Sequence, residues 1–263
     1  MDERFVSYAG HRVRVWEQGT GEPVVFLAGF MGLPRWIPFL DLLAENRRVI
    51  VPSLPGFPGA AEHRHLDDLA DWVAATLAIL EAATDPPVDV VASSVGGALA
   101  LEAAAANRSL VRRLVLIAPF GVYDDTQSAV DPWAQRPGPD SYPRLLCAKP
   151  ERFQALWEKP ASADATAGDE IEWQILEVRG REASARYLWP LGDTGILKRA
   201  YRLTQPMLLL RGSEDALIPK SCLEKLQHAV AGEAVLHEIA GAGHLVELDE
   251  PEALAGAIRQ FLN

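Results

Sequence analysis

The sequence has few cysteines and a shortage of positive charge, and each shortage excludes a class of protein. Only Cys147 and Cys222 occur among 263 residues, so a disulfide framework or a cysteine zinc site is not expected. Acidic residues outnumber Lys and Arg by 36 to 25, which gives a formal net charge of −11. Nucleic-acid binding requires clustered basic residues, so neither a DNA or RNA partner nor an anionic membrane surface is expected.

Long apolar runs are also lacking. No stretch approaches the roughly 20 apolar residues that a membrane-crossing helix requires. Residues 1–4 do not begin a basic segment followed by an apolar one, so no secretory signal is predicted. These absences favour a cytoplasmic protein with no membrane partner and leave its oligomeric state open.

The chain does have a regular alternation of strand-like and helix-like segments. Residues 5–8 and 12–16 alternate in polarity, which predicts an antiparallel hairpin at a sheet edge. Helical apolar patterns cover 66–82 and 98–106. Short apolar runs, typical of parallel strands buried on both faces, occur at 24–27, 49–51, 88–92 and 114–117. The pattern predicts an α/β fold, with a mostly parallel central sheet of about eight strands flanked by helices.

The alternation stops after Pro119 and returns with an apolar run at 207–210. The segment 121–204 instead contains four of the seven tryptophans: Trp133, Trp157, Trp173 and Trp189. We interpret 121–204 as a helical cap, inserted into an α/β core that consists of 1–120 and 205–263. The core is expected to close with a helix over 220–230, a strand over 235–239 and a helix over 251–261.

A serine stands where a buried strand runs directly into a helix. A tight turn at this junction requires small residues two positions before and two positions after the serine, because larger side chains would collide. Ser94 meets this requirement with Ala92 and Gly96, whereas Ser93 would have a valine at each position. Ser94 is therefore the candidate nucleophile, and the alternative is that it only caps the helix.

The motif at Ser94 resembles the nucleophile elbow of the α/β-hydrolases, a family that orders its catalytic residues as Ser, acid and His. The resemblance implies His244 as the general base, because it ends a small-residue loop before the last helix. It implies Asp215 as the orienting acid, in a Gly-x-x-Asp pattern followed by Pro219. Asp124 or Asp125 is the fallback, since some members carry the acid after the sixth strand.

The same resemblance implies two backbone donors for an oxyanion, the N–H groups of Phe30 and Val95. The chain departs from the family at Ala28, where relatives usually have His, so a side chain that normally braces this loop is missing. It departs again at Ser53, where relatives usually have Asp. We expect Ser53 to affect local hydrogen bonding rather than chemistry.

Several large side chains are candidates for a substrate pocket. Met31, Phe120, Trp133 and Trp157 would suit an apolar or aromatic substrate, although the aromatic residues of the insertion would equally form its own small core. The arginines of the insertion, Arg179, Arg181 and Arg186, are candidates for binding a substrate carboxylate or for a solvated helix face.

No cofactor or metal is expected. His63 and His65, with Glu62 or Asp67, would be the only metal candidates, and we interpret these histidines as parts of a solvated polar loop.

These features predict a serine hydrolase that cleaves a small carboxylic ester or a related acyl compound through an acyl-enzyme. The run Ser94-Val95-Gly96-Gly97 also resembles the Ser-x-Gly-Gly of carbon–carbon bond hydrolases that act on ring-cleavage products. Leu245 counts against this alternative, because those enzymes usually have Trp after the catalytic His. A lyase or perhydrolase with the same triad, and a non-catalytic receptor for a small ligand, are further alternatives.

Overall fold

The computed structural model describes residues 1–127, 130–135, 141–161 and 167–263. The strands in these ranges are β1 (Asp2–Tyr8), β2 (His11–Gln18), β3 (Pro23–Leu27), β4 (Arg48–Pro52), β5 (Val88–Ser93), β6 (Val111–Ile117), β7 (Met207–Gly212) and β8 (Ala234–Ile239). They form one sheet in the order β1-β2-β4-β3-β5-β6-β7-β8. β2 pairs antiparallel with β1 and β4, and the other neighbours are parallel, which confirms the predicted α/β sheet with an antiparallel hairpin.

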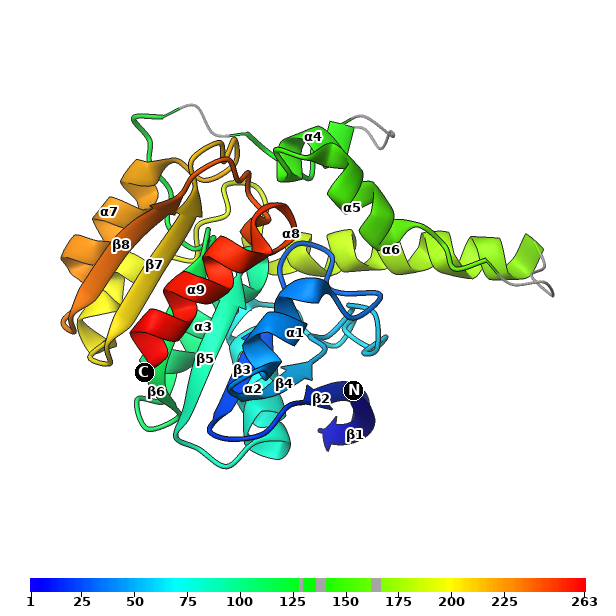
Figure 1. Cartoon of the computed structure of the whole chain (residues 1–263), viewed down its shortest axis with the longest axis horizontal. Coiled ribbons are helices and arrows are strands. Elements are labelled where there is room, and N and C mark those ends of the chain that lie inside the picture. The colour runs from blue at the N-terminus through cyan, green and yellow to red at the C-terminus, as the bar shows by residue number, and fades with distance from the viewer. Residues whose placement is uncertain (128–129, 136–140, 162–166) are drawn as a thin grey trace.

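Helices cover both faces of this sheet (Figure 1). Those of the core are α1 (Pro38–Ala44), α2 (Leu69–Ala83), α3 (Ser94–Ala106), α7 (Lys220–Ala229), α8 (Val246–Asp249) and α9 (Pro251–Leu262). α1 packs with α9 on one face, and α2 packs with α3 on the other. The sequence did not reveal α1 or α8, because helices of seven and four residues are too short to show an apolar repeat.

α2 begins three residues later than the sequence indicated, because Asp68 caps it. The Asp68 carboxylate accepts hydrogen bonds from the N–H groups of Ala70 and Asp71, at 2.8 and 3.1 Å. The Asp71 side chain accepts from the Asp68 N–H in return, which completes a capping box. The helix then buries Trp72 and Leu80 against the core.

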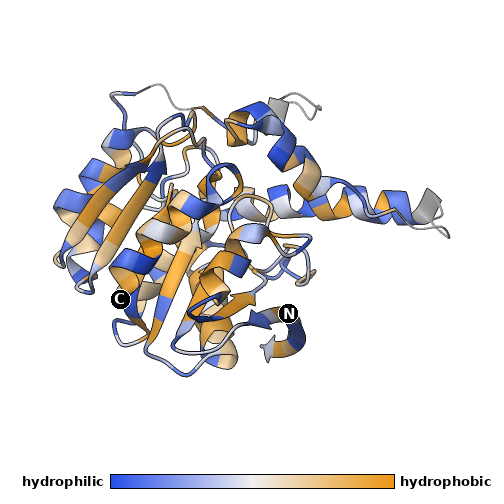
Figure 2. Ribbon diagram, in the orientation of Figure 1, coloured by the Kyte–Doolittle hydropathy of each residue, from blue (hydrophilic) through white to orange (hydrophobic). Residues whose placement is uncertain are grey.

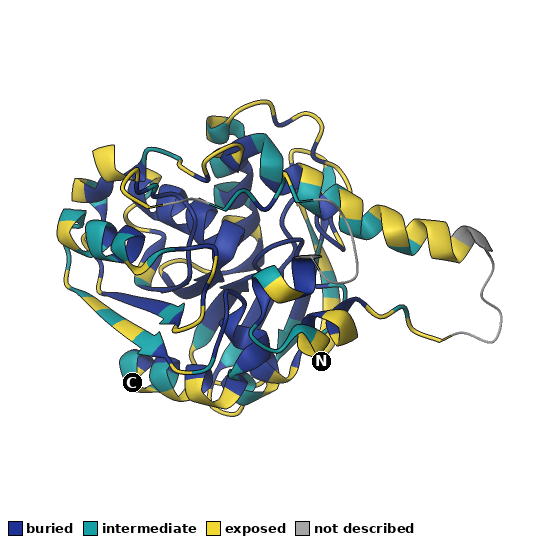
Figure 3. Cartoon of the chain, turned by 90° about the horizontal axis from the view of Figure 1, so that it is seen from above, coloured by how far each residue is buried: buried dark blue, intermediate teal, exposed yellow. Residues whose placement is uncertain are grey.

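The centre of the sheet is apolar, and β5 is buried along its whole length (Figures 2 and 3). Its one charged residue, Asp89, lies near the amino end of the strand and is fully buried. Three guanidinium groups surround the Asp89 carboxylate: those of Arg112 at 2.9 Å, Arg113 at 3.1 Å and Arg47 at 3.4 Å. Because buried charge is tolerated only when paired, these arginines let a carboxylate occupy the sheet.

Helices occur in the described part of the segment between β6 and β7. Its helices are α4 (Ser141–Leu146), α5 (Pro150–Trp157) and α6 (Ala167–Leu188), followed by the short 3₁₀ turns η1 (Ile196–Lys198) and η2 (Ala200–Arg202). The first half of α6 extends away from the body of the molecule, and its last turns pack against it (Figures 1 and 3). The division into a core and a cap at 121–204 stays a prediction, and that range includes residues outside those described.

Candidate active site

Ser94 lies at the turn between β5 and α3, in an unusual backbone conformation. Its φ of 52° falls in the left-handed region, which an L side chain enters only at a cost of roughly 1–2 kcal/mol. α3 begins at Ser94 itself, and the N-cap position belongs to Ser93, whose side chain makes no capping hydrogen bond. The structure therefore does not support a helix-capping role for Ser94. Backbone strain of this kind is typical of functional sites.

Close packing explains the small residues around this turn. A Cβ atom on Gly96 would lie 2.5 Å from the carbonyl oxygen of Ala28, in the loop after β3. A Cβ atom on Gly29, in the same loop, would lie 3.0 Å from the Cβ of Ser94. The loop after β3 and the turn at Ser94 therefore approach each other through glycine on both sides, and a side chain on either would separate them.

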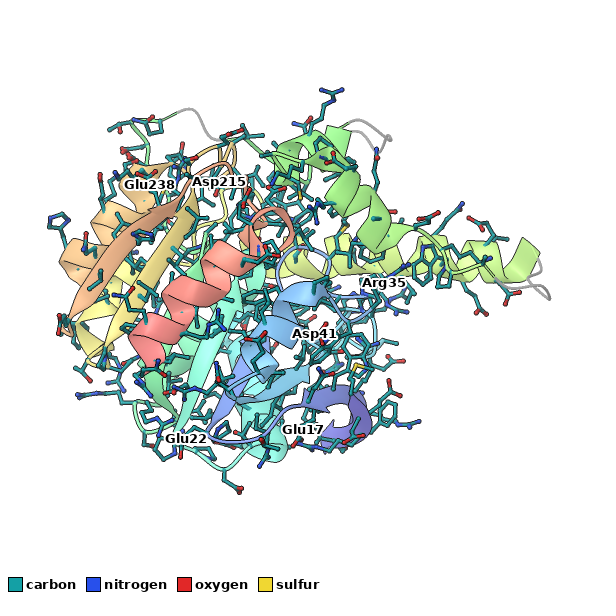
Figure 4. The ribbon with its side chains drawn as sticks, in the orientation of Figure 1. Glu17, Glu22, Arg35, Asp41, Asp215 and Glu238 are labelled. Carbon is teal, nitrogen blue, oxygen red and sulfur yellow. The ribbon has the colours of Figure 1, made fainter. Side chains whose placement is uncertain are left out.

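Three side chains from separate parts of the chain meet at the carboxyl edge of the sheet. Ser94 Oγ lies 2.7 Å from His244 Nε2, so the hydroxyl can donate to a neutral imidazole. On the other side of the ring, Nδ1 lies 3.1 Å from Oδ2 of Asp215. The side chains of His244 and Asp215 are fully buried. Figure 4 labels Asp215 at this edge, just beyond the end of β7. This geometry suits a nucleophile, a base and an orienting acid.

The surroundings of Asp215 keep its carboxyl group ionised. Burial alone would raise the pKa of Asp215, but the charge and hydrogen bond of His244 oppose burial, and the net pKa is lowered. The N–H groups of Leu217 and Ile218 add to this effect by donating to Oδ1, at 2.8 and 3.0 Å. An ionised carboxylate at this position can stabilise an imidazolium ion on His244.

The fallback acids lie elsewhere. Asp124 accepts hydrogen bonds from Lys225 Nζ at 2.8 Å and from the Thr126 N–H at 3.0 Å. The ion pair with Lys225 is the largest of the effects that lower the pKa of Asp124. Asp125 is exposed. Of the candidate acids, the structure brings Asp215 to the histidine.

The loop that carries Phe30 is pressed against the candidate nucleophile. Phe30 and Val95 are both buried, and the Gly32 N–H closes a turn by donating to the Gly29 carbonyl at 2.9 Å. Met31 has a φ of 66°, a second left-handed residue beside the site. Gly29, which follows Ala28, packs directly on the turn at Ser94. The N–H groups of Phe30 and Val95 stay the proposed oxyanion donors.

Aromatic side chains cover one side of the candidate site. The Phe120 ring stands edge-on to His244, with 5.6 Å between ring centroids. Trp133 lies 5.6 Å from Phe120 and 6.2 Å from Phe30, and Phe30 stacks on Tyr142 at 6.0 Å. Sequence reasoning missed Tyr142, because one tyrosine in a segment without a clear pattern gives no signal.

The other two predicted pocket residues, Met31 and Trp157, are not part of this aromatic cluster. Met31 follows Phe30 in the loop after β3 and is fully buried. Trp157, at the end of α5, pairs with Trp173 of α6 at 6.3 Å, and its carbonyl accepts from the indole N–H of Trp173 at 2.9 Å. For Trp157 the contacts favour the interpretation that it belongs to the core of the inserted helices.

Two acidic residues after His244 were not given roles by the sequence, and both are buried. Asp249 accepts hydrogen bonds from the N–H groups of Gly243 and Ala148, each at 2.8 Å, so it joins the histidine loop to the segment before α5. Glu247 lies against Ser93, and burial raises its pKa. The sequence shows acidic residues at positions 247, 249 and 250. Which of their side chains point inward depends on the fold of α8.

The three arginines of α6 differ in their partners. Arg179 donates to the Gly56 carbonyl and Arg186 to the Leu66 carbonyl, each at 3.2 Å, so both brace loops of the core. The guanidinium carbon of Arg181 lies 4.4 Å from the centroid of the Tyr142 ring. The buried Nε of Arg181 makes no hydrogen bond to any residue that the structure describes.

The solvated-loop interpretation is wrong for His63. Its side chain is buried, and its Nε2 pairs with the carboxylate of Glu182 on α6. His65 instead stacks on His11, with ring centroids 4.0 Å apart. Within the described ranges, no three His, Cys, Asp or Glu side chains are grouped so as to hold a metal ion. No described helix combines the length and the apolar character needed to cross a membrane.

Known proteins resemble the chain over nearly its whole length. The alpha/beta hydrolase family matches residues 24–257. A 2-hydroxy-6-oxo-2,4-heptadienoate hydrolase of Pseudomonas putida is 26% identical, over 98% of this chain and 95% of the relative. A 2-hydroxymuconate semialdehyde hydrolase of a Pseudomonas species is 27% identical, over 98% and 93%.

Solved structures of proteins described by different activities share the fold of this chain. A 2-hydroxy-6-oxo-6-phenylhexa-2,4-dienoate hydrolase from a Rhodococcus strain superimposes with a TM-score of 0.79 at 19% identity, over 99% of this chain and 98% of that one. A putative lipase from Acinetobacter baumannii superimposes with a TM-score of 0.75 at 15% identity, over 99% and 90%. At these identities the superpositions speak for the fold alone.

Proposed function

The chain belongs to the alpha/beta hydrolase family, and from this premise we propose that it hydrolyses a carbon–carbon bond beside a ketone in a ring-cleavage product. Ser94 is the proposed nucleophile, His244 the base and Asp215 the acid that orients it. The observation that carries the proposal is the 2.7 Å approach of Ser94 Oγ to His244 Nε2, at a strained turn.

The substrate class is argued from the relatives and from the nucleophile motif. Both curated relatives described above are hydrolases of open-chain dienoates or semialdehydes, and each aligns with almost all of this chain. Gly96 and Gly97 complete a Ser-x-Gly-Gly motif that resembles the nucleophile motif of such enzymes. We therefore favour carbon–carbon cleavage over the ester cleavage that the sequence alone predicts.

Arg181 is the proposed partner for the substrate carboxylate. Its guanidinium group lies over Tyr142, which in turn stacks on Phe30 beside the candidate oxyanion loop. Arg179 and Arg186 already donate to backbone carbonyls, whereas the Nε of Arg181 has no partner among the described residues. An arginine fork suits a carboxylate well, because it can bind both oxygens at once.

The proposed reaction has two steps. Ser94 loses its proton to His244 and bonds to the ketone carbon, while the N–H groups of Phe30 and Val95 stabilise the oxyanion. The carbon–carbon bond breaks in the keto tautomer of the substrate, in which the carbon next to the ketone is saturated. Its electron pair passes into the adjoining unsaturated ketone, and the resulting dienolate takes a proton derived from His244. In the second step water attacks the acyl-enzyme, His244 accepts the water proton, and Ser94 recovers a proton as the carboxylic acid leaves.

The test is to offer the purified protein 2-hydroxy-6-oxo-2,4-heptadienoate and p-nitrophenyl acetate separately. We expect the conjugated chromophore of the dienoate to disappear with release of one acetate per molecule. We expect its kcat/KM to exceed that of the ester by about 100-fold, because only the dienoate engages Arg181 as well as the triad. Ser94→Ala should abolish turnover, and the exposed Ser109→Ala is the matched control.

Ester hydrolysis is the second candidate, and Leu245 is the residue that favours it. Leu245 is buried beside Gly29, and ring-cleavage hydrolases usually have Trp at this position. Turnover of p-nitrophenyl acetate without turnover of the dienoate would decide for this candidate. Turnover of both substrates by Ser94→Ala would contradict either candidate.

A further inference from the structure

The last turns of α6 present one buried face to the candidate active site. Gly180, Ala183, Ser184 and Tyr187 follow spacings of three, four and seven residues, which place them on the same side of a helix. All four are buried, whereas Ile171, Ile175 and Val178 in the preceding turns are exposed. The part of α6 that packs on the core is therefore short and specific.

Gly180 contacts the loop of the proposed oxyanion donor Phe30. A Cβ atom at Gly180 would lie 2.8 Å from the carbonyl oxygen of Met31 and 3.0 Å from its Cα. These are backbone atoms, so they cannot move aside as the end of a flexible side chain would. Met31 follows Phe30 directly and has a φ of 66°. The helix thus rests on the residue next to the first donor.

Tyr187 contacts the segment of the other proposed donor. Its hydroxyl donates to the Val95 carbonyl, with 3.4 Å between the oxygens. The Tyr187 ring packs on Trp72 of α2 at 4.7 Å, which holds the phenol in place from the core side. Burial raises the pKa of Tyr187, so the phenol stays neutral and keeps its proton for this hydrogen bond.

Ser184 connects the same face to the aromatic cluster. Its hydroxyl oxygen accepts a hydrogen bond from the indole N–H of Trp133 at 3.1 Å. Trp133 lies beside Phe30 and Phe120. The face formed by Gly180, Ala183, Ser184 and Tyr187, which we call the brace, therefore contacts the two donor segments and the rings that cover the site.

We propose that the brace sets the position of the two oxyanion donors relative to Ser94, and that Gly180 and Tyr187 are its positioning residues. The proposal rests on the function proposed above, because it takes the N–H groups of Phe30 and Val95 as the donors. In this arrangement the inserted segment does more than cover a substrate. It forms a fixed wall, against which the loop after β3 and the turn at Ser94 are both held.

The physical reason is that an oxyanion hole depends steeply on geometry. Loss of a single donor typically lowers the rate by about 10²–10³-fold. A displacement of about 1 Å can cost up to roughly 100-fold. In the loop after β3, where relatives usually have a bracing His, this chain has Ala28. Packing of α6 on Met31 supplies a brace from outside the loop.

The test uses a fluorophosphonate probe, whose reaction with a serine nucleophile requires the same donors whatever the natural substrate is. We compare the rate constant of labelling in wild type, Tyr187→Phe and Gly180→Ala. The matched controls are Tyr201→Phe, at an exposed tyrosine, and Gly256→Ala, at a helical glycine whose added Cβ would meet no atom within 4 Å.

We expect labelling to slow by about tenfold in Tyr187→Phe and by about 10–100-fold in Gly180→Ala, and both controls to keep the wild-type rate. With whichever substrate is turned over, both brace variants should have a lower kcat and a KM near the wild-type value. A purely structural role would instead lower the melting temperature and the labelled fraction, and leave the rate constant of the folded molecules unchanged.

The outcomes separate this inference from the proposed function. If wild type is not labelled, or if Ser94→Ala is still labelled, the proposed nucleophile is wrong. If wild type is labelled and both brace variants react at the wild-type rate, the brace is wrong and the nucleophile stands. Should Gly180→Ala fail to fold, the rate constant of Tyr187→Phe decides.

Discussion

Asp215 and Glu214 are adjacent in the chain, but only one of the two carboxylates faces the candidate base. Asp215 is buried and directed at His244 Nδ1, whereas Glu214 is exposed. Neutralising the two carboxylates one at a time therefore tests whether Asp215 orients His244.

Asp215→Asn should lower kcat by about 10⁴-fold, because an amide can hold His244 in the wrong tautomer and cannot stabilise an imidazolium ion. Glu214→Gln should keep the wild-type rate. Turnover of the dienoate or of the ester, whichever is active, measures both. Equal kcat values in wild type and Asp215→Asn would remove Asp215 from the mechanism.

Glu247 is a buried carboxyl group whose titration links stability to pH. Burial raises its pKa above the ordinary value of 4.5, so folding takes up a proton at pH values between the unfolded and folded pKa. Its favourable contribution is complete below the unfolded pKa and is lost as pH rises through the folded pKa. Asp215 has the opposite sign, because its pKa is lowered and its contribution is lost only as pH falls below 3.8.

We expect Glu247→Gln to flatten the fall in the free energy of unfolding as pH rises above about 4.5, because glutamine does not titrate. Urea unfolding at a series of pH values measures this slope. The exposed Glu252→Gln on α9 is the control and should reproduce the wild-type slope. A wild-type slope in Glu247→Gln would show that Glu247 is not protonated in the folded state.

At the scale of elements, α8 and the segment before α5 are joined by one carboxylate. Asp249 accepts from the N–H groups of Gly243 and Ala148 through Oδ2, and from the Lys149 N–H at 3.0 Å through Oδ1. Three donors on a buried carboxylate hold the histidine loop against the inserted segment. Local geometry at His244 therefore depends on an interaction between two elements.

Asp249→Asn should lower both the melting temperature and kcat, because the new NH₂ group would face a backbone donor that then loses its partner. An unsatisfied buried donor costs about 1–3 kcal/mol. Differential scanning fluorimetry and steady-state turnover measure the two effects, with the exposed Asp125→Asn as the control. Unchanged stability would mean that water replaces the lost acceptor at no cost.

Across the whole molecule, the buried ion pairs of Asp89 and the candidate nucleophile Ser94 lie at opposite ends of β5. Asp89 and its three arginines are near the amino end of the strand, and Ser94 follows its carboxyl end. The two sites are separated by several residues of buried strand. We therefore expect stability and catalysis to respond independently to substitutions at these two ends.

Asp89→Asn should lower the free energy of unfolding by about 1–3 kcal/mol, because the largely buried Arg47 loses its counter-ion, whereas the exposed Arg112 keeps its ion pair with Glu22. The kcat of the folded fraction should stay at the wild-type value. Urea unfolding and active-site titration with the fluorophosphonate probe measure the two quantities, and the exposed Asp85→Asn is the control. A loss of kcat per titrated site would contradict the independence of the two ends.

The α/β class, the antiparallel hairpin and Ser94 as the candidate nucleophile could be predicted from the sequence alone. These are local or periodic properties: buried strands are apolar runs, and a tight turn demands small neighbours on each side. Ser94 could thus be chosen over Ser93 without any knowledge of the fold. The resemblance to the α/β-hydrolases also implied His244 as the base and Asp215 as the acid, with Asp124 or Asp125 left as an alternative acid.

Which polar groups lie in contact could not be predicted from the sequence, because it depends on the tertiary fold. It brought Asp215 rather than Asp124 to His244, buried His63 against Glu182, and turned Asp249 inward. It also gave α6 its contacts with Met31 and Val95, two segments far from it in the chain. Such contacts depend on how helices cross and how loops close, and no periodicity within one segment encodes the partner on another.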